Sequence, residues 1–238
     1  NTIQTFNHFG RATGARIFDK QGNIVVDSDE MIEALTFYKN LCQYNMPGAV
    51  EPGDVFRSFP SGNTAIVVIA SYLINSISTS NPKLVPATGS SYTVQENIKS
   101  SYAAPSALVP IVGMSEKQAK ISKEWMKWLM TGKRRTDFLH IVPGGFNPVR
   151  KSVLYSKEYL APETYQNWGP ETFIKIVEAA QDATIFGWFP DGTVIPEIGT
   201  VAQTRVVAKG ISDMTQKDKE PQEVARQMKE DIVEVLGY

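Results

Sequence analysis

Residues 56–77, FRSFPSGNTAIVVIASYLINSI, are the stretch from which the fold is best inferred. A short amphipathic piece is followed by a turn at residues 61–63. Residues 64–69 are apolar, rich in β-branched side chains and without alternation, which predicts a short strand covered on both faces. Ser71 is then expected to be the N-cap of a helix that runs to the end of the stretch.

Tyr72 would stand on the first turn of that helix. In open α/β sheets, ligands bind where the carboxyl end of a strand meets the N-terminus of a helix. A tyrosine offers a flat apolar face and a hydroxyl group, so we expect Tyr72 to lie beside a small polar ligand; a role in the core is the alternative. Asn75, one turn later, could bond a ligand hydroxyl or lie on the surface.

Composition bounds the class of protein. The chain has 238 residues, 42% hydrophobic and 21% charged, with a formal net charge of −1. This is ordinary globular composition without the basic excess that nucleic-acid binding favours. We expect Cys42, the single cysteine, to be an inert buried thiol. Two histidines without a cysteine cluster make a zinc site unexpected. We expect neither a metal nor a cofactor. The chain lacks an initiator Met and a signal core, so either processing removed them or it begins inside a longer protein.

Three further elements are predicted in the first half of the chain, on either side of residues 56–77. Residues 17–26 have the pattern of a β-hairpin. Asp27 is expected to cap the next helix, with Glu30 completing a capping box. Residues 83–85 are expected to form a short strand. The apolar face of the capped helix consists of Met31, Leu35, Tyr38, Leu41 and Cys42.

The second half of the chain alternates extended and helical patterns. Residues 100–112 carry two prolines and are expected to be extended. Ser115 and Gln118 form a capping box that begins a helix, and Trp125 and Trp128 on its apolar face are expected to be core residues. The final helix, residues 221–236, has an inward face made of Val224, Met228, Ile232 and Val235.

The order of these motifs resembles a known family. The chain is similar to the C-terminal part of the extracellular solute-binding proteins that deliver sugars to ABC importers, the maltose-binding-protein-like group. The motifs that carry the resemblance are DKQG (19–22), ALTFY (34–38), FPSGNTAI (59–66), the extended 102–112, WMKWL (125–129), GGFNP (144–148) and PQEVAR (221–226).

The resemblance implies an α/β, periplasmic-binding-protein-like (type II) C-terminal lobe plus the returning segment of the N-terminal lobe. Residues 1–99 and 151–238 would build the C-terminal lobe. Residues 100–150 would contain the hinge crossings and the returning segment. Most of the N-terminal lobe would be absent, as a separate fragment or through truncation, and Trp125 and Trp128 would pack against its residues.

The implied function is reversible capture of a sugar or oligosaccharide between two lobes and its delivery to a membrane permease, outside the cytoplasm (periplasmic or cell-surface). The implied partners are a carbohydrate, the permease and the missing N-terminal lobe, with no nucleic acid. Arg150 is more simply a surface residue than a ligand contact. The ligand-binding candidates are Tyr72, Asn75, Tyr102, Gly145, Phe146, Asn147 and Trp188.

No catalytic residue is expected under this interpretation. The GGFNP glycines could form a simple turn, and Tyr102 could serve hinge packing. The competing class is a carbohydrate-active hydrolase that uses Asp191 and Glu197, the nearest approach to paired carboxylates beside aromatic residues. A structural or sensor domain with the same fold is a third possibility.

Overall fold

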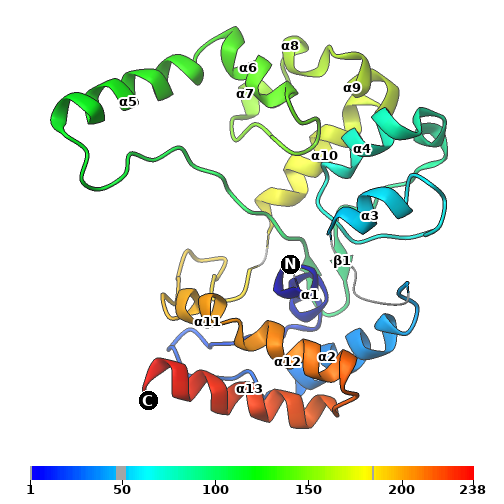
Figure 1. The fold of residues 1–238 in the computed structure, drawn as a ribbon, viewed down its shortest axis with the longest axis vertical. Coiled ribbons are helices and arrows are strands. Elements are labelled where there is room, and N and C mark those ends of the chain that lie inside the picture. Colours follow the sequence, from blue (N-terminus) through cyan, green and yellow to red (C-terminus); the bar gives the residue numbers. More distant parts are fainter. Residues whose placement is uncertain (1, 47–51, 184) are drawn as a thin grey trace. The chain divides into compact units, whose positions relative to one another are not determined.

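The computed structural model describes residues 2–46, 52–183 and 185–238, and these divide into two compact units (Figure 1). Unit 1 consists of Asn1–Pro52, Ser91–Ala103 and Ala179–Tyr238, and unit 2 consists of Gly53–Ser90 and Ala104–Glu178. The assignment of residues 1–99, 100–150 and 151–238 to lobes of a complete protein divides the chain at other positions and stays a prediction.

Unit 1 is built from helices around a single apolar core. Its short strands β1 and β2 pair antiparallel, Val94 with Ser100 and Gln95 with Lys99. The elements of unit 1 are α1 (Thr2–Thr13), α2 (Asp29–Cys42), β1 (Val94–Gln95), β2 (Lys99–Ser100), α11 (Ile198–Thr204), α12 (Val206–Gln216) and α13 (Pro221–Leu236).

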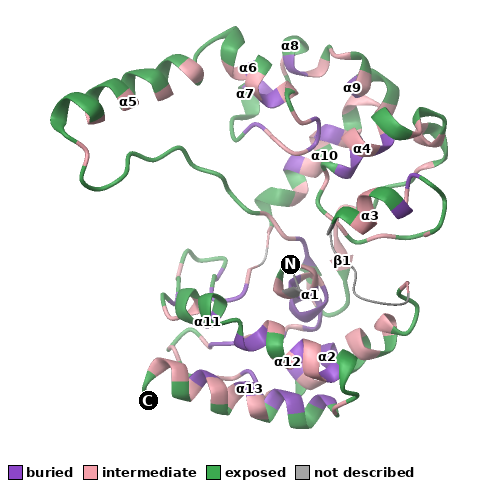
Figure 2. Cartoon of the chain, viewed as in Figure 1, coloured by how far each residue is buried: buried purple, intermediate pink, exposed green. Residues whose placement is uncertain are grey.

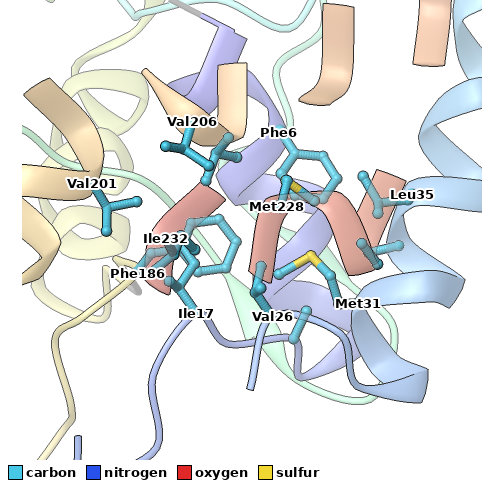
Figure 3. Packing of buried hydrophobic residues seen from close by; sticks show 14 of the residues in the cluster. Phe6, Ile17, Val26, Met31, Leu35, Phe186, Val201, Val206, Met228 and Ile232 are labelled. Atoms are coloured by element: carbon cyan, nitrogen blue, oxygen red, sulfur yellow. The ribbon is translucent and has the colours of Figure 1, made fainter. Parts of the chain in front are cut away.

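Phe6 is a fully buried member of this core, and Figure 3 shows it beside Met228. Its ring meets that of Tyr38 edge-on at 5.5 Å and stacks on that of Phe186 at 6.1 Å. Aromatic pairs in these geometries add to the stabilisation that burial of apolar area provides. The inward face predicted for the last helix is confirmed, because Val224, Met228 and Ile232 are buried and Val235 packs against them.

The first turn of unit 1 forms as predicted, but the helix cap does not. Phe18 and Ile24 bridge antiparallel and the Val25 N–H donates to the Ile17 carbonyl, so residues 17–26 form a minimal hairpin. The prediction that Asp27 caps α2 is wrong. Ser28 is the N-cap, and its side chain accepts from the Met31 N–H. The Asp27 carboxylate instead pairs with Lys229 of α13 at 2.8 Å.

Unit 2 has a smaller core rich in aromatic rings. Tyr165 stacks on Phe173 with ring centroids 3.8 Å apart, and Tyr159 lies edge-on to Tyr165 at 5.1 Å. Burial raises the pKa of the Tyr159 phenol far above its usual value. The elements of unit 2 are α3 (Pro52–Ser58), α4 (Leu73–Ser80), a 3₁₀ helix η1 (Pro82–Ala87), α5 (Glu116–Leu129), α6 (Lys133–His140), α7 (Lys151–Leu154), α8 (Lys157–Leu160), α9 (Glu163–Trp168) and most of α10 (Pro170–Gln181).

Two strands predicted in this unit are not formed. Residues 64–69 are irregular, and Ile66 is 81% exposed. A strand needs neighbours for its backbone groups, and among the described residues no strand pairs with this segment. Residues 83–85 lie in η1 instead, where Pro82 takes the first helical position and the Leu84 N–H bonds the Asn81 carbonyl.

Helix α5 begins with the predicted capping box. The Ser115 side chain accepts from the Gln118 N–H, and the Gln118 side chain bonds the Ser115 N–H. Trp125 and Trp128 are not core residues in the described structure. They are 51% and 53% exposed, and α5 has no buried residue (Figure 2). Among the described residues, no helix is both long and apolar enough to cross a membrane.

Candidate functional site

The site is built around Tyr72, the residue immediately before α4. Its ring stacks on that of Phe56 from α3, with centroids 4.7 Å apart and planes at 27°. Tyr72 is 37% exposed, so hydrocarbon does not enclose the ring. Phe56 therefore holds one aromatic face in place. The sequence predicted a short amphipathic segment around Phe56. Nothing in the spacing of its residues indicated that Phe56 would support Tyr72.

A hydrogen bond fixes this junction to the GGFNP crossing. Ser71 does not cap α4, because its hydroxyl donates to the Gly144 carbonyl. The Asn147 side-chain amide donates to the same carbonyl at 3.0 Å, so both of its lone pairs are used. The sequence suggested no link between Ser71 and Gly144, since the two residues are 73 positions apart.

The glycines of the crossing allow this close approach. Gly144 has φ +77°, and a Cβ atom there would lie 2.6 Å from the Ser71 carbonyl oxygen. At Gly145 a Cβ atom would lie 3.0 Å from the Tyr72 Cβ and 2.6 Å from Val142. The structure thus brings Tyr72 and Gly145 together, and that the two residues bind a common ligand stays a prediction.

The remaining candidates of unit 2 lie close to these residues in the chain. Asn75 is half-buried on α4, and its N–H bonds the Tyr72 carbonyl. The Phe146 ring stacks on that of Phe138 at 5.0 Å and packs against the core of unit 2. The Asn147 Oδ1 is buried and has no hydrogen-bond partner among the described residues. The amide nitrogen of Asn147 donates to the Gly144 carbonyl and so helps to orient Gly144. Arg150 is exposed.

Two candidates belong to unit 1. The Tyr102 ring meets that of His8 edge-on at 6.0 Å, and burial lowers the pKa of His8. Trp188 is 51% exposed. It forms an isolated antiparallel β-bridge with Val194 across a tight turn, like the bridge between Phe18 and Ile24. Unit 1 therefore has an exposed aromatic side chain of its own, and each unit contributes part of the predicted ligand-binding set.

Asp191 lies at the tip of the turn that contains Trp188. Its carboxylate pairs with Lys20 at 2.6 Å, and the Arg16 guanidinium lies 4.6 Å over the ring of Phe189. These contacts join the turn to the hairpin at residues 17–26. The bond from Lys20, assisted by the Thr193 N–H, lowers the pKa of Asp191 to about 2. A general acid needs a raised pKa, so this pairing does not favour the hydrolase interpretation.

The Lys20–Asp191 pair gives a pH prediction. Because the folded-state pKa of Asp191 is depressed, its contribution to stability is full above the unfolded value of about 3.9. That contribution disappears as the pH falls through about 2. We therefore expect Asp191→Asn to lower the melting temperature slightly at pH 7 and to unfold like the wild type near pH 2. An Asp191 carboxyl that titrates at pH 4 or above in an NMR titration would contradict this.

Comparison with known proteins identifies the fold. No model of a known protein family matches the chain. The structure has the fold of periplasmic solute-binding proteins. It matches the maltose-bound T. maritima MalE3 with a TM-score of 0.68 and 13% identity, over 97% of this chain and 56% of that one. An ABC transporter solute-binding protein of Agrobacterium radiobacter K84 in complex with ribitol gives 0.70 and 17%, over 97% and 55%.

A curated protein shows the same resemblance in sequence. The putative ABC transporter periplasmic-binding protein YcjN of Escherichia coli (strain K12) is 23% identical over 215 residues, which cover 90% of this chain and 49% of YcjN. The chain therefore spans about half the length of the proteins it matches. The resemblance to maltose-binding-protein-like solute-binding proteins and the fold class inferred from the sequence are confirmed.

Proposed function

We propose that this chain is about half of a solute-binding protein that captures a sugar or polyol between two lobes and delivers it to the permease of an ABC importer. The protein would act outside the cytoplasm, and its N-terminal lobe would lie outside this chain. Residues 1–99 and 151–238 would form the C-terminal lobe, and residues 100–150 would contain the hinge crossings and the returning segment. We propose no catalytic step for the described residues.

The observation that carries the proposal is the exposed ring of Tyr72, held by Phe56 beside Gly145. A pyranose has an apolar C–H face that stacks on an aromatic ring, while its hydroxyl groups require directional hydrogen bonds. The relatives with this fold support a carbohydrate-like ligand, since they were solved with maltose and with ribitol.

Capture would work by closure of the two lobes around the ligand. A ligand shifts an open–closed equilibrium only by its difference in affinity for the two states. Contacts that the N-terminal lobe makes with the ligand only in the closed state would provide that difference, in addition to the contacts from the C-terminal lobe. No bond is made or broken in such a cycle, so binding should be stoichiometric.

A thermal-shift panel on the complete protein tests the proposal. Maltose, ribitol and a set of monosaccharides are the probes, and a ligand at about 100 times its Kd should stabilise the folded protein by about 2.7 kcal/mol. Tyr72→Ala should weaken binding of the best ligand by about 10- to 100-fold in titration calorimetry. Tyr44→Ala is the matched control, because Tyr44 is 87% exposed and far along the chain from the site.

Three outcomes would count against this function. The first is a panel in which no ligand raises the melting temperature. The second is unchanged affinity in Tyr72→Ala. The third is turnover of an oligosaccharide that Asp191→Asn abolishes, since this would favour the hydrolase.

A further inference from the structure

Unit 1 contains the same backbone turn twice, at residues 17–25 and at residues 187–195; we call them the Phe18 turn and the Trp188 turn. Each has a glycine at the matching position, with φ of +85° in one and +88° in the other, and no other residue is identical at matching positions. The backbone N–H groups bond matching carbonyls, from Asp19 to Asn23, Gly22 to Asp19 and Val25 to Ile17 in the Phe18 turn, and from Phe189 to Thr193, Gly192 to Phe189 and Ile195 to Gly187 in the Trp188 turn.

The matching side chains are buried in one turn and exposed in the other. Phe18 bridges Ile24 and is 1% exposed, and Ile24 packs against the core of unit 1. Trp188 and Val194 take the same two positions, but they are 51% and 43% exposed. The shared backbone therefore does not by itself require an exposed aromatic ring. An exposed aromatic ring beside a β-branched side chain is suited to the apolar face of a bound molecule, in keeping with the candidate role of Trp188.

Two cationic side chains next to and within the Phe18 turn hold the Trp188 turn. The Lys20 ammonium lies 2.6 Å from the Asp191 carboxylate and 5.8 Å from the centre of the Phe189 ring. The Arg16 guanidinium lies 4.6 Å over the same ring. Phe189 directly follows Trp188 and is only 7% exposed. We call these contacts the brace, because they fix the turn both at its tip and at the residue beside Trp188.

We propose that Lys20 and Arg16 are positioning residues for ligand capture, which hold the Trp188 turn in the orientation in which the Trp188 ring meets a sugar or polyol. The inference rests on the proposed function, because it takes Trp188 to be a ligand contact. A side chain that is already ordered loses less conformational freedom when the ligand binds. The brace therefore raises the affinity without touching the ligand.

Two other roles for Lys20 make different predictions. The first is a purely stabilising surface ion pair. The side chains of Lys20 and Asp191 are 51% and 49% exposed, and such pairs contribute little to the free energy of unfolding, so this role predicts no change in affinity. The second is direct contact between the Lys20 ammonium and the ligand. This role requires the positive charge at position 20 itself, whereas the brace requires only that opposite charges face each other.

Hydrogen exchange of the complete protein, without added sugar, tests the brace. In Lys20→Met, the Phe189 and Ile195 amides that close the Trp188 turn should exchange about two- to fivefold faster. The Asp19 and Val25 amides at the matching positions of the Phe18 turn should keep their rates, because they donate to backbone carbonyls and not to the Lys20 side chain. Equal acceleration in both turns, or none in either, would contradict the brace.

Titration calorimetry tests the consequence for binding. The probe is whichever of maltose, ribitol and the monosaccharides of the thermal-shift panel binds the complete wild-type protein best. Lys20→Met and Arg16→Met should each weaken its binding by about 3- to 10-fold. Exchange of the two charges in Lys20→Asp with Asp191→Lys should restore the affinity to within about twofold. Lys209→Met is the matched control, because Lys209 of α12 pairs at 2.9 Å with Asp231 of α13 in the same unit, and it should leave the affinity unchanged.

The outcomes separate this inference from the proposed function. Unchanged affinity in Lys20→Met would overturn the positioning role and leave the proposed function standing. Loss of affinity that the exchanged charges do not restore would also overturn it, in favour of direct contact between Lys20 and the ligand. If no probe of the panel binds the wild-type protein, the proposed function fails, and the positioning role fails with it.

Discussion

Gly144→Ala is expected to destabilise unit 2 by about 2–5 kcal/mol, because it combines left-handed backbone strain with a steric overlap. A Cβ atom at this position would lie 2.6 Å from the Ser71 carbonyl oxygen, which belongs to the backbone and cannot rotate away. The crossing would have to move, and both hydrogen bonds to the Gly144 carbonyl would weaken. Hydrogen exchange of the unit 2 amides measures the loss.

Gly62→Ala is the matched control for this prediction. Gly62 has the same φ of +77° and lies in the same unit, but nothing lies within 4 Å of the added Cβ atom. It should therefore cost only the strain of the left-handed conformation, about 1–2 kcal/mol. Equal losses in the two variants would show that the close approach of Ser71 to Gly144 does not exist in solution.

Phe6→Ala is expected to destabilise unit 1 by about 3–5 kcal/mol. The side chain is fully buried and joins α1 to Tyr38 of α2 and to Phe186, so its removal leaves a cavity between three parts of the unit. Because the chain has two units, a single melting temperature would mix their responses. Hydrogen exchange of the unit 1 amides is the better measurement.

Phe37→Ala serves as the control for Phe6→Ala. Phe37 is also an aromatic residue of unit 1, and its ring lies 5.5 Å from that of Phe9, but it is 51% exposed. Its replacement should cost less than about 1 kcal/mol. If Phe37→Ala were as costly as Phe6→Ala, the burial of Phe6 in the core of unit 1 would be contradicted.

Local patterns in the sequence predicted some of the helices, whereas α1, α7, α8 and α9 were not predicted. Apolar periodicity identified the inward face of α13, and the Ser115–Gln118 pair marked the start of α5, because both signals depend only on residues within a few turns. The cap of α2 was misplaced by one residue. Asp27 and Ser28 are both residue types that favour the N-cap, and in the structure Ser28 takes it while Asp27 pairs with Lys229, which lies 202 positions away in the chain.

The strands were harder to predict for a physical reason. The composition of residues 64–69 favours a strand, but strand formation depends on neighbours that a local pattern does not contain. In the described structure these residues have no strand beside them. The same limit applies to Trp125 and Trp128, whose spacing indicates a buried face without saying which part of a protein covers it.

The candidate site was predicted residue by residue but not as an arrangement. Tyr72 and Gly145 were both named as candidates, and the structure places them side by side, but their role in ligand binding stays a prediction. The stacking of Phe56 on Tyr72 and the bond from Ser71 to Gly144 could not be inferred, because they join segments that only the folded chain brings together. That all seven candidates contact one ligand stays a prediction.

The discontinuous composition of unit 1 has a consequence for synthesis on the ribosome. Its first and last stretches, Asn1–Pro52 and Ala179–Tyr238, share one core, and the segments of unit 2 lie between them. The apolar surfaces that α1 and α2 bury against α12 and α13 therefore stay exposed until those last two helices have been translated. The segments of unit 2 leave the ribosome before α12 and α13. Such delayed closure exposes a nascent chain to aggregation and makes it a natural client for chaperones.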